Sequence, residues 1–322
     1  MRKNICIVFT SFLFLKCYSL RFWKGFEKHG IPKKQEAKLK NLYELNRKTI
    51  LDLGSSFKNM THYTESDVTI VKRNSDSIRK LGPVLVLPGL DMSGLSVFPN
   101  VVRAGQKRDS YIVLAGYSKN QTLEELCDVV VNFVVSNRLE DITIIGESFG
   151  GLMALSVSSI IKQRISHMIL LNPATSYHKT SWHRVVNKMG NFESINSKLL
   201  SHGPSIQHVV ESIYHMSEHH PEHLYFYIVS YFMMLFNIIV TDRILVKHRI
   251  NSYMSISQYE IDSLCKNVKI PTTIIVGEKD KMLPSLKEAV ILNKSIELST
   301  VIRVKEAGHL FCASDFDIRD LL

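Results

Sequence analysis

GESFGG, at residues 146–151, stands between the apolar run ITII at residues 142–145 and the stretch LMALSVSSIIK that ends at residue 162. A Gly-x-Ser-x-Gly pattern in this setting predicts a sharp turn from strand to helix, which needs small residues two positions before and after the serine. Such a turn exposes the hydroxyl of Ser148 at the carboxyl edge of a sheet, near a helix N-terminus that favours developing negative charge. The alternative is a tight turn before a glycine-rich helix start, with no chemistry attached.

The chain around this turn alternates short apolar runs with helical patterns from residue 82 onward. Strands that are apolar almost throughout and alternate with helices predict an α/β fold, with a mostly parallel central sheet and helices on both faces. The predicted strands span residues 68–71, 83–87, 111–115, 142–145, 167–171, 272–276 and 301–304, and the predicted helices span residues 122–137, 150–162 and 285–293. A Thr-x-x-Glu capping box at Thr122 and Glu125 marks the start of the first helix.

A long interval separates the predicted strands at 167–171 and 272–276. Residues 176–265 exceed a normal crossover, so we expect them to form an inserted helical cap. Within it, the stretch from Leu224 to Val240, LYFYIVSYFMMLFNIIV, is almost wholly apolar. It is interpreted as a cap helix that lines an acyl pocket, as a membrane-surface contact, or as a short transmembrane span, although Asn237 and its modest length argue against the span.

A serine hydroxyl becomes a strong nucleophile only when a base removes its proton, so a histidine must come from elsewhere in the chain. Among the thirteen histidines, His309 follows the predicted strand TVIRV in the loop KEAGHLF near the end of the chain. The order serine, acid, histidine places the acid in the loop after TTIIV, where Asp280 is our candidate and Glu278 its rival. Asp280 would hold the tautomer of His309 and stabilise the imidazolium that forms.

An acyl-transfer site also needs two N–H donors for the oxyanion of the tetrahedral intermediate. We expect one from the backbone of Phe149, directly after the nucleophile. The other is expected from the backbone of Leu90, with Asp91 as the alternative, in the turn after PVLVLPG.

Charge distribution and residue spacing argue against nucleic-acid binding and metal binding. The net charge is +10, but residues 1–48 hold 12 Lys/Arg and 3 Asp/Glu, so the rest of the chain is nearly neutral and offers nucleic acid no basic stripe. A histidine cluster at residues 215–223 is interrupted by Pro221 and has no cysteine nearby, so we interpret it as a solvated surface. We predict neither a metal nor a cofactor.

The start of the chain predicts a targeting segment. Basic residues at positions 2–3, an apolar run at 5–15 and small residues near position 19 are typical of a signal peptide over residues 1–19. A basic, acid-poor extension follows over residues 20–48, either as a transit-like segment behind the signal or as an ordinary basic helix of a secreted or endomembrane protein. Only Cys127, Cys265 and Cys312 remain after the signal, which gives no disulfide framework and favours a reducing compartment.

The stretches LPGLD, GESFGG and NPATS, together with VGEKDKMLPS and KEAGHLF, give the chain a more specific likeness. From residue 82 to about residue 320 it resembles the plant and algal esterase/lipase/thioesterase family of the α/β-hydrolase superfamily, which includes phytyl ester synthases. The resemblance implies an α/β-hydrolase fold, Ser148, Asp280 and His309 as a catalytic triad, residence in plastids, and movement of fatty acyl groups from thioesters or galactolipids onto phytol or diacylglycerol. Many members also carry an acyltransferase-like half with an H-x-x-x-x-D motif, whereas His309 and Asp315 here miss that spacing by one residue.

These observations predict one α/β-hydrolase domain over residues 49–322, with the cap at 176–265. The expected activity is that of a serine acyl hydrolase or acyltransferase on a lipid ester or acyl-thioester, through an acyl-enzyme on Ser148. The alternatives are a non-catalytic lipid-binding or receptor protein of the same fold and a serine peptidase.

Overall fold

The computed structural model describes residues 60–65, 68–75, 81–89, 97, 100–101, 104–115, 122–175, 256–280, 283–305, 307–309, 311 and 316–322. Several expectations fall outside these ranges. They are the signal peptide and basic extension at 1–48, most of the cap insertion with its apolar stretch at 224–240, the histidine cluster at 215–223, and Cys312.

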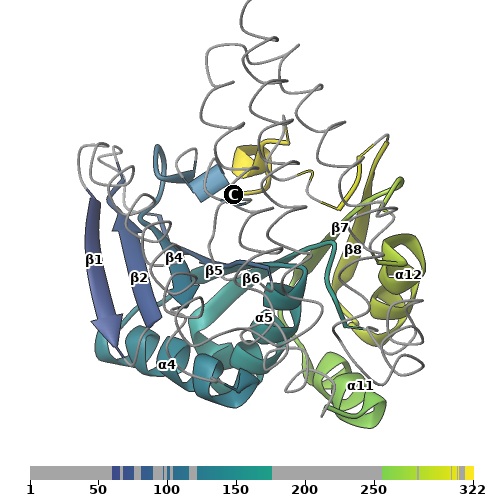
Figure 1. Ribbon diagram of the computed structural model, residues 1–322, viewed down its shortest axis with the longest axis horizontal. Helices are drawn as coiled ribbons and strands as arrows, with labels where there is room; N and C mark the ends of the chain where they lie inside the picture. The colour runs from purple at the N-terminus through teal and green to yellow at the C-terminus, as the bar shows by residue number, and fades with distance from the viewer. Residues whose placement is uncertain are drawn as a thin grey trace, which may run out of the picture. The chain divides into compact units, whose positions relative to one another are not determined.

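An eight-stranded sheet forms the centre of the described part, in the order β1-β2-β4-β3-β5-β6-β7-β8 (Figure 1). Its strands are β1 Met60–Glu65, β2 Val68–Arg73, β3 Val84–Leu87, β4 Ser110–Ala115, β5 Ile142–Glu147, β6 Ile165–Leu171, β7 Thr272–Gly277 and β8 Ser299–Val304. The pairs β1–β2 and β2–β4 are antiparallel, and every pair from β4 to β8 is parallel. The predicted mostly parallel sheet is therefore confirmed.

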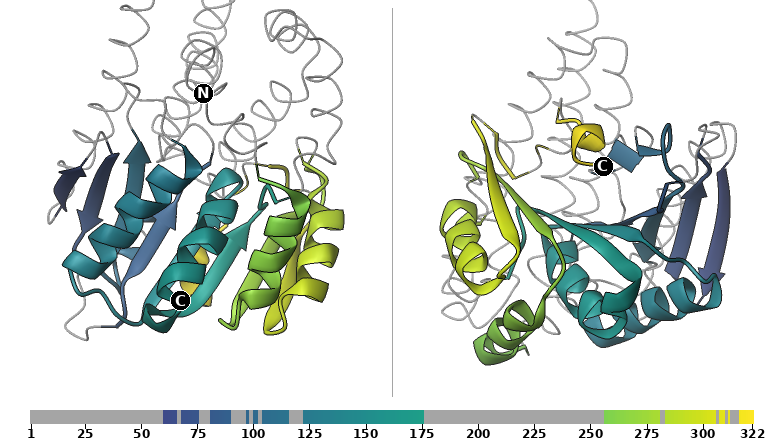
Figure 2. Two further views of the ribbon diagram at one scale, coloured as in Figure 1. Left: turned by 90° about the horizontal axis from the view of Figure 1, so that it is seen from below. Right: turned by 180° about the vertical axis from the view of Figure 1, so that it is seen from behind.

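The four described α-helices all pack on one face of this sheet, as the left view of Figure 2 shows. They are α4 Leu123–Ser136, α5 Phe149–Ile161, α11 Gln258–Asn267 and α12 Ser285–Ser295. On the opposite face, the described part of the chain packs Val97, Val101 and Ala104 and the 3₁₀-helix η6, Ile318–Leu321, against the strands. Side chains of successive strand residues point to opposite faces of the sheet. In β5, Ile144 packs against the helices, and Ile145 packs in the cluster on the other face.

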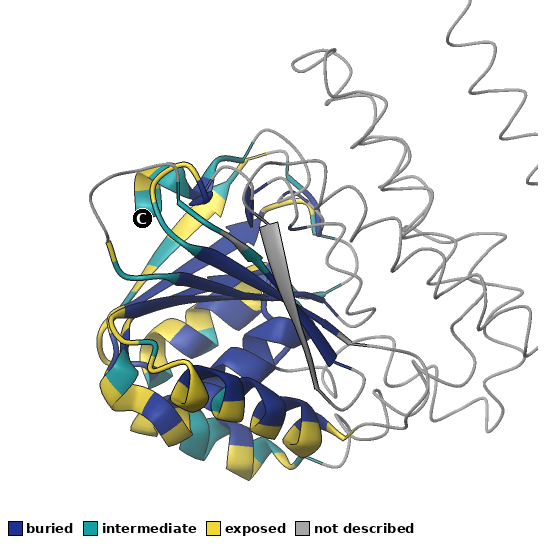
Figure 3. Ribbon diagram, turned by 90° about the vertical axis from the view of Figure 1, so that its left-hand side faces the viewer, coloured by how far each residue is buried: buried dark blue, intermediate teal, exposed yellow. Residues whose placement is uncertain are grey.

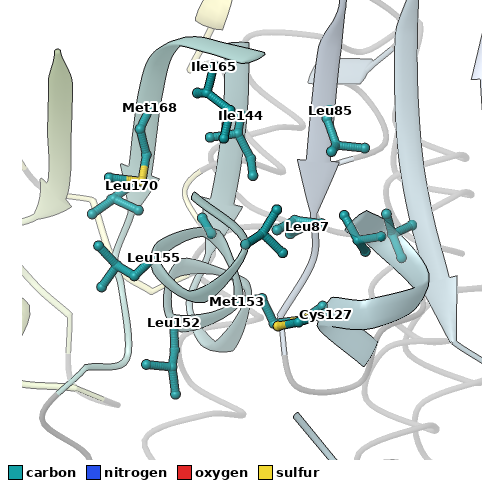
Figure 4. Packing of buried hydrophobic residues seen from close by; sticks show 14 of the residues in the cluster. Leu85, Leu87, Cys127, Ile144, Leu152, Met153, Leu155, Ile165, Met168 and Leu170 are labelled. Atoms are coloured by element: carbon teal, nitrogen blue, oxygen red, sulfur yellow. The ribbon is translucent and has the colours of Figure 1, made fainter. Parts of the chain in front are cut away.

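Helix α5 lies in the middle of the helical layer and is apolar around nearly its whole circumference. Its side chains pack against β3, β5 and β6 and against the neighbouring helices α4 and α11. Figure 4 shows Met153 and Leu155 of this helix among side chains from the strands and from α4. The sheet is buried throughout its centre, while the helices on its flank present an exposed outer face (Figure 3). Because α5 is buried along most of its length, it gives Ser148, at its N-terminus, a rigid support.

Capping boxes begin two of the helices. At α4 the Glu125 N–H donates to the Thr122 hydroxyl, and the Thr122 N–H donates to the Glu125 carboxylate, so the predicted box is present. An equivalent box between Ser257 and Glu260 begins α11, which we did not predict.

Helix α11 changes one expected boundary. It overlaps the end of the predicted cap, yet its buried Ile261 and Cys265 belong to the core cluster shared with α5 and α12. Residues 258–267, which include the end of the range predicted as cap, are therefore part of the helical layer that packs on the sheet. The hydrophobic pattern did not predict this helix, because most of its residues are polar and only two positions on its apolar side are buried.

Candidate active site

Ser148 occupies a sharp turn between β5 and α5. Its backbone has φ 53° and ψ −117°, a conformation that costs a residue with a side chain about 1–3 kcal/mol unless its surroundings hold it. The surroundings do so through two backbone bonds, from the Ser148 N–H to the Leu171 carbonyl and from the Ala174 N–H to the Ser148 carbonyl, both at 2.9 Å.

The glycines of GESFGG are required by close backbone approach. A Cβ at Gly146 would lie 2.3 Å from the carbonyl oxygen of Gly150, and a Cβ at Gly150 would lie 2.0 Å from that of Leu87. Both distances are far shorter than a van der Waals contact, so the turn needs glycine at these two positions, as the pattern predicts. Gly151, outside the strict pattern, is also constrained, because a Cβ there would lie 2.7 Å from the Pro173 side chain.

The structure brings Ser148, His309 and Asp280 together at the carboxyl ends of β5, β8 and β7. Nε2 of His309 lies 3.0 Å from Oγ of Ser148, and Nδ1 of His309 lies 2.7 Å from Oδ2 of Asp280. The side chains of His309 and Asp280 are 4% and 1% exposed. The rival acid, Glu278, is an exposed residue of the same loop.

The start of α12 fixes the carboxylate of Asp280. Its Oδ1 accepts from the Leu283 N–H at 3.0 Å, and its Oδ2 accepts a short bond from the Ser285 hydroxyl in addition to the bond from His309. Ser285 was not predicted. The signal that could have found it is a hydroxyl residue directly after Pro284, at the first position of a helix that follows the acid.

A family model described as the alpha/beta hydrolase fold matches residues 82–316. The chain belongs to this family. The match spans all parallel strands of the sheet and the three residues that meet at their carboxyl ends.

Individual proteins are similar at lower identity. A Mycoplasma pneumoniae protein described as an esterase/lipase is 23% identical over 202 residues, which cover 60% of this chain and 69% of that protein. The solved structure of carboxylesterase CesB from Bacillus subtilis has a TM-score of 0.55 at 14% identity and covers 88% of this chain and 94% of its own. A structure from Acinetobacter baumannii described as a lipase has a TM-score of 0.56 at 15% identity, with coverage of 84% and 91%. At these identities the two structures support the fold alone.

Within this α/β-hydrolase, the acid and the histidine shift each other's pKa. Burial alone would raise the pKa of Asp280, but the charge of His309 and the hydrogen bonds from His309, Ser285 and Leu283 together lower it. Burial alone would lower the pKa of His309, but the charge and hydrogen bond of Asp280 and the charge of Glu147 together raise it. The pair is thus arranged to stabilise a charged imidazolium beside a carboxylate.

Glu147 is a second carboxylate whose charge acts on this histidine, and it was not among the predicted site residues. It is 1% exposed and occupies the variable position directly before the serine. Its Oε2 would lie 3.7 Å from a Cβ at Gly89, so its carboxylate is close to the chain just after the end of β3. Its negative charge acts on His309 without belonging to the Ser148–His309–Asp280 series.

Of the two predicted oxyanion donors, the structure describes only one. Phe149 is the first residue of α5, so its N–H belongs to the helix N-terminus next to Ser148. Leu90 and Asp91 lie outside the described residues, but Gly89 is described, and a Cβ there would lie 3.7 Å from Cβ of Ser148. Gly89, the residue before the predicted donor Leu90, therefore lies close to Ser148.

Three further features of the described part of the chain concern metal ligands, thiol reactivity and membrane-spanning helices. No group of three or more His, Cys, Asp or Glu there is arranged to hold a metal ion. Cys127 and Cys265 are free and buried, and burial raises the pKa of each thiol to about 12, which keeps them protonated and unreactive. Among the described helices, none is long and apolar enough to cross a membrane.

Proposed function

We propose that this α/β-hydrolase cleaves fatty acyl esters or thioesters through an acyl-enzyme on Ser148. The observation that carries the proposal is the continuous hydrogen-bonded series from Ser148 Oγ through both ring nitrogens of His309 to Asp280, at 3.0 and 2.7 Å. These distances lie within the range that proton transfer from a nucleophile to its base requires.

Each residue then has one role. His309 takes the proton of Ser148 as the hydroxyl attacks the acyl carbonyl, and returns it to the departing alcohol or thiol. Asp280 holds the ring so that Nε2 faces the serine, and its negative charge stabilises the imidazolium. The N–H of Phe149, with that of Leu90, would bind the oxyanion, and water would release the acyl group in the second half of the cycle.

The names of the relatives support an ester substrate, because the matched Mycoplasma pneumoniae protein is described as an esterase/lipase. The apolar stretch from Leu224 to Val240 supports a fatty acyl chain over a small polar ester, since acyl pockets are lined by apolar and aromatic side chains. Transfer to a lipid alcohol is the second candidate. It is favoured by the likeness of LPGLD, GESFGG and NPATS to the plant and algal family.

The test is product analysis with the full-length chain on acyl-thioester, galactolipid and p-nitrophenyl esters, with and without phytol or diacylglycerol. Ser148→Ala is compared with Ser159→Ala, which removes an exposed hydroxyl from the outer side of the same helix. We expect free fatty acid from the wild type and from Ser159→Ala, and none from Ser148→Ala. A new phytyl ester or triacylglycerol would establish transfer instead, and inactivity of the wild type on the whole panel would favour a receptor or a peptidase.

A further inference from the structure

Asn172 lies directly after β6, at the same edge of the sheet as the three residues above. Its side chain is fully buried, and its backbone has a φ of 40°. Asparagine is one of the few residues that tolerate this left-handed conformation. It is the first residue of the NPATS stretch, to which the proposed reaction assigns no role.

The amide of Asn172 joins the two loops that carry the acid and the histidine. Its Nδ2 donates to the carbonyl of Gly308 at 3.0 Å and to the carbonyl of His309 itself at 2.8 Å. Its Oδ1 accepts from the N–H of Gly277, three residues before Asp280, at 2.9 Å. Both N–H donors of one buried side chain are thus used on the histidine loop, and its oxygen is used on the acid loop.

The nucleophile is tied to the same segment. The Ser148 N–H donates to the carbonyl of Leu171, and the Ser148 carbonyl accepts from the N–H of Ala174. Asn172 lies between these two partners in the chain. The short segment 171–174 therefore contacts the backbone of the serine on both sides and, through one amide, the loops of the other two residues.

The loops also have a connection of their own, because the Lys279 N–H donates to the carbonyl of Ala307 at 2.8 Å. They can thus stay together without Asn172. The amide adds a hydrogen bond to the carbonyl of His309. This bond fixes the position of the backbone from which the imidazole side chain extends. A small displacement there moves Nε2 relative to Ser148 Oγ, and displacements of about 1 Å in a catalytic group can lower rates about 100-fold.

We propose that Asn172 is a positioning residue, whose amide sets the placement of His309 relative to Ser148 and Asp280. The inference rests on the proposed function, since it assigns a role in the same reaction. Asn172 does not touch the reacting atoms, so its effect on the reaction is carried entirely by the backbone of Gly308, His309 and Gly277.

Two substitutions distinguish the effect of losing the amide hydrogen bonds from the effect of changing the backbone conformation. Asn172→Gly keeps the left-handed conformation accessible and removes all three bonds. Asn172→Asp keeps the shape and the acceptor for Gly277, but places an oxygen against the two carbonyls in place of the N–H donors. Thr143→Val is the matched control: this buried residue of β5 loses a hydrogen bond with Arg108, away from Ser148.

Three quantities are measured on the full-length chain: the thermal unfolding midpoint, kcat and KM on p-nitrophenyl acetate, and the rate at which folded protein reacts with a fluorophosphonate. We expect both Asn172 variants to lose about 10- to 100-fold in kcat and in labelling rate, with KM nearly unchanged. We expect Thr143→Val to lower the midpoint while folded protein keeps wild-type kcat and labelling.

The outcomes are distinguishable. Wild-type labelling rates and kcat in folded Asn172 variants would overturn this inference and leave the proposed function standing. Failure of both variants to fold would assign Asn172 a purely structural role and overturn it as well. A wild-type protein that neither reacts with the probe nor hydrolyses the ester would overturn the proposed function, and this inference with it.

Discussion

At the scale of single residues, the turn at Ser148 depends on atoms that leave no room for a side chain. Gly150 is the tightest point, because a Cβ there would lie 2.0 Å from a backbone oxygen, and a backbone cannot give way as a flexible side chain can. Gly89 offers the contrast within the same site, since a Cβ there would lie an ordinary 3.7 Å from the nearest of the residues that the structure describes.

We therefore expect Gly150→Ala to lower the free energy of unfolding by about 3 kcal/mol or more, or to prevent folding. Gly89→Ala should change it by no more than about 0.5 kcal/mol, the usual range for a site without a clash. Urea denaturation checks both, and a Gly150→Ala protein as stable as the wild type would show that the turn is looser than described.

Glu147 predicts a distinctive pH dependence. His309 acts as a base only when neutral, so kcat/KM should rise with pH through the pKa of His309, which lies above its ordinary value of about 6.5. The charge of Glu147 contributes to that rise. Glu147→Gln removes the charge, so the pKa of His309 should fall and the acidic limb of the profile should move to lower pH.

The pH profile of kcat/KM on p-nitrophenyl acetate measures this shift. Glu278→Gln is the control, because it removes an exposed carboxylate whose charge is screened by solvent. A limb that stays in place in Glu147→Gln, or that moves to higher pH, contradicts the assignment.

The meeting of Ser148, His309 and Asp280 could be predicted because chain order and position after strands determine which loops share an edge of the sheet. The contributions of Ser285, Glu147 and Asn172 could not. Glu147 and Asn172 act on segments distant in the sequence, and neither hydrophobic period nor spacing records which side chain will face the histidine. Ser285 lies only five residues after Asp280, but a strand and helix pattern does not show that its hydroxyl turns back to the carboxylate.

At the scale of elements, helix α11 was missed although it belongs to the core. Its capping box at Ser257 and Glu260 and its two buried residues place it in the helical layer. Ser257→Ala removes the box, and we expect it to lower the free energy of unfolding by about 1 kcal/mol, as Thr122→Ala should at α4. The measurement is urea denaturation of both variants. A change at Thr122 with none at Ser257 would mean that α11 does not unfold with the domain.

Strand positions were predicted well, whereas their ends were not. Several strands extend into polar or small residues, such as Ser110, Glu147, Gly277 and Ser299, which an apolar run does not include. These residues pair through their backbones, and a hydrophobic pattern carries no information on backbone pairing. Strand β1, MTHYTE, was missed for the same reason, because it is polar and lies at the edge of the sheet.

At the scale of the whole described domain, the sheet separates two apolar clusters. Among the described residues, the helices pack on one face, and Val97, Val101 and Ala104 pack on the other together with η6. Ile318 is the buried residue of η6, at 1% exposure. Ile318→Ala should lower the free energy of unfolding by about 2–4 kcal/mol, because it leaves a cavity against the sheet.

The control for this prediction is Leu298→Ala, which truncates a side chain that is 50% exposed. We expect a change of no more than about 0.5 kcal/mol there. Equal effects of the two substitutions, measured by urea denaturation, would show that η6 does not cover the second face.

The central claim, that Ser148 is a nucleophile activated by His309, is tested most directly by peptide mass spectrometry after treatment with a fluorophosphonate. We predict one adduct on the peptide that contains Ser148, none on that peptide in Ser148→Ala, and a strongly slowed reaction in folded His309→Ala. An adduct on another residue, or labelling of Ser148 that proceeds equally fast without His309, would contradict the account.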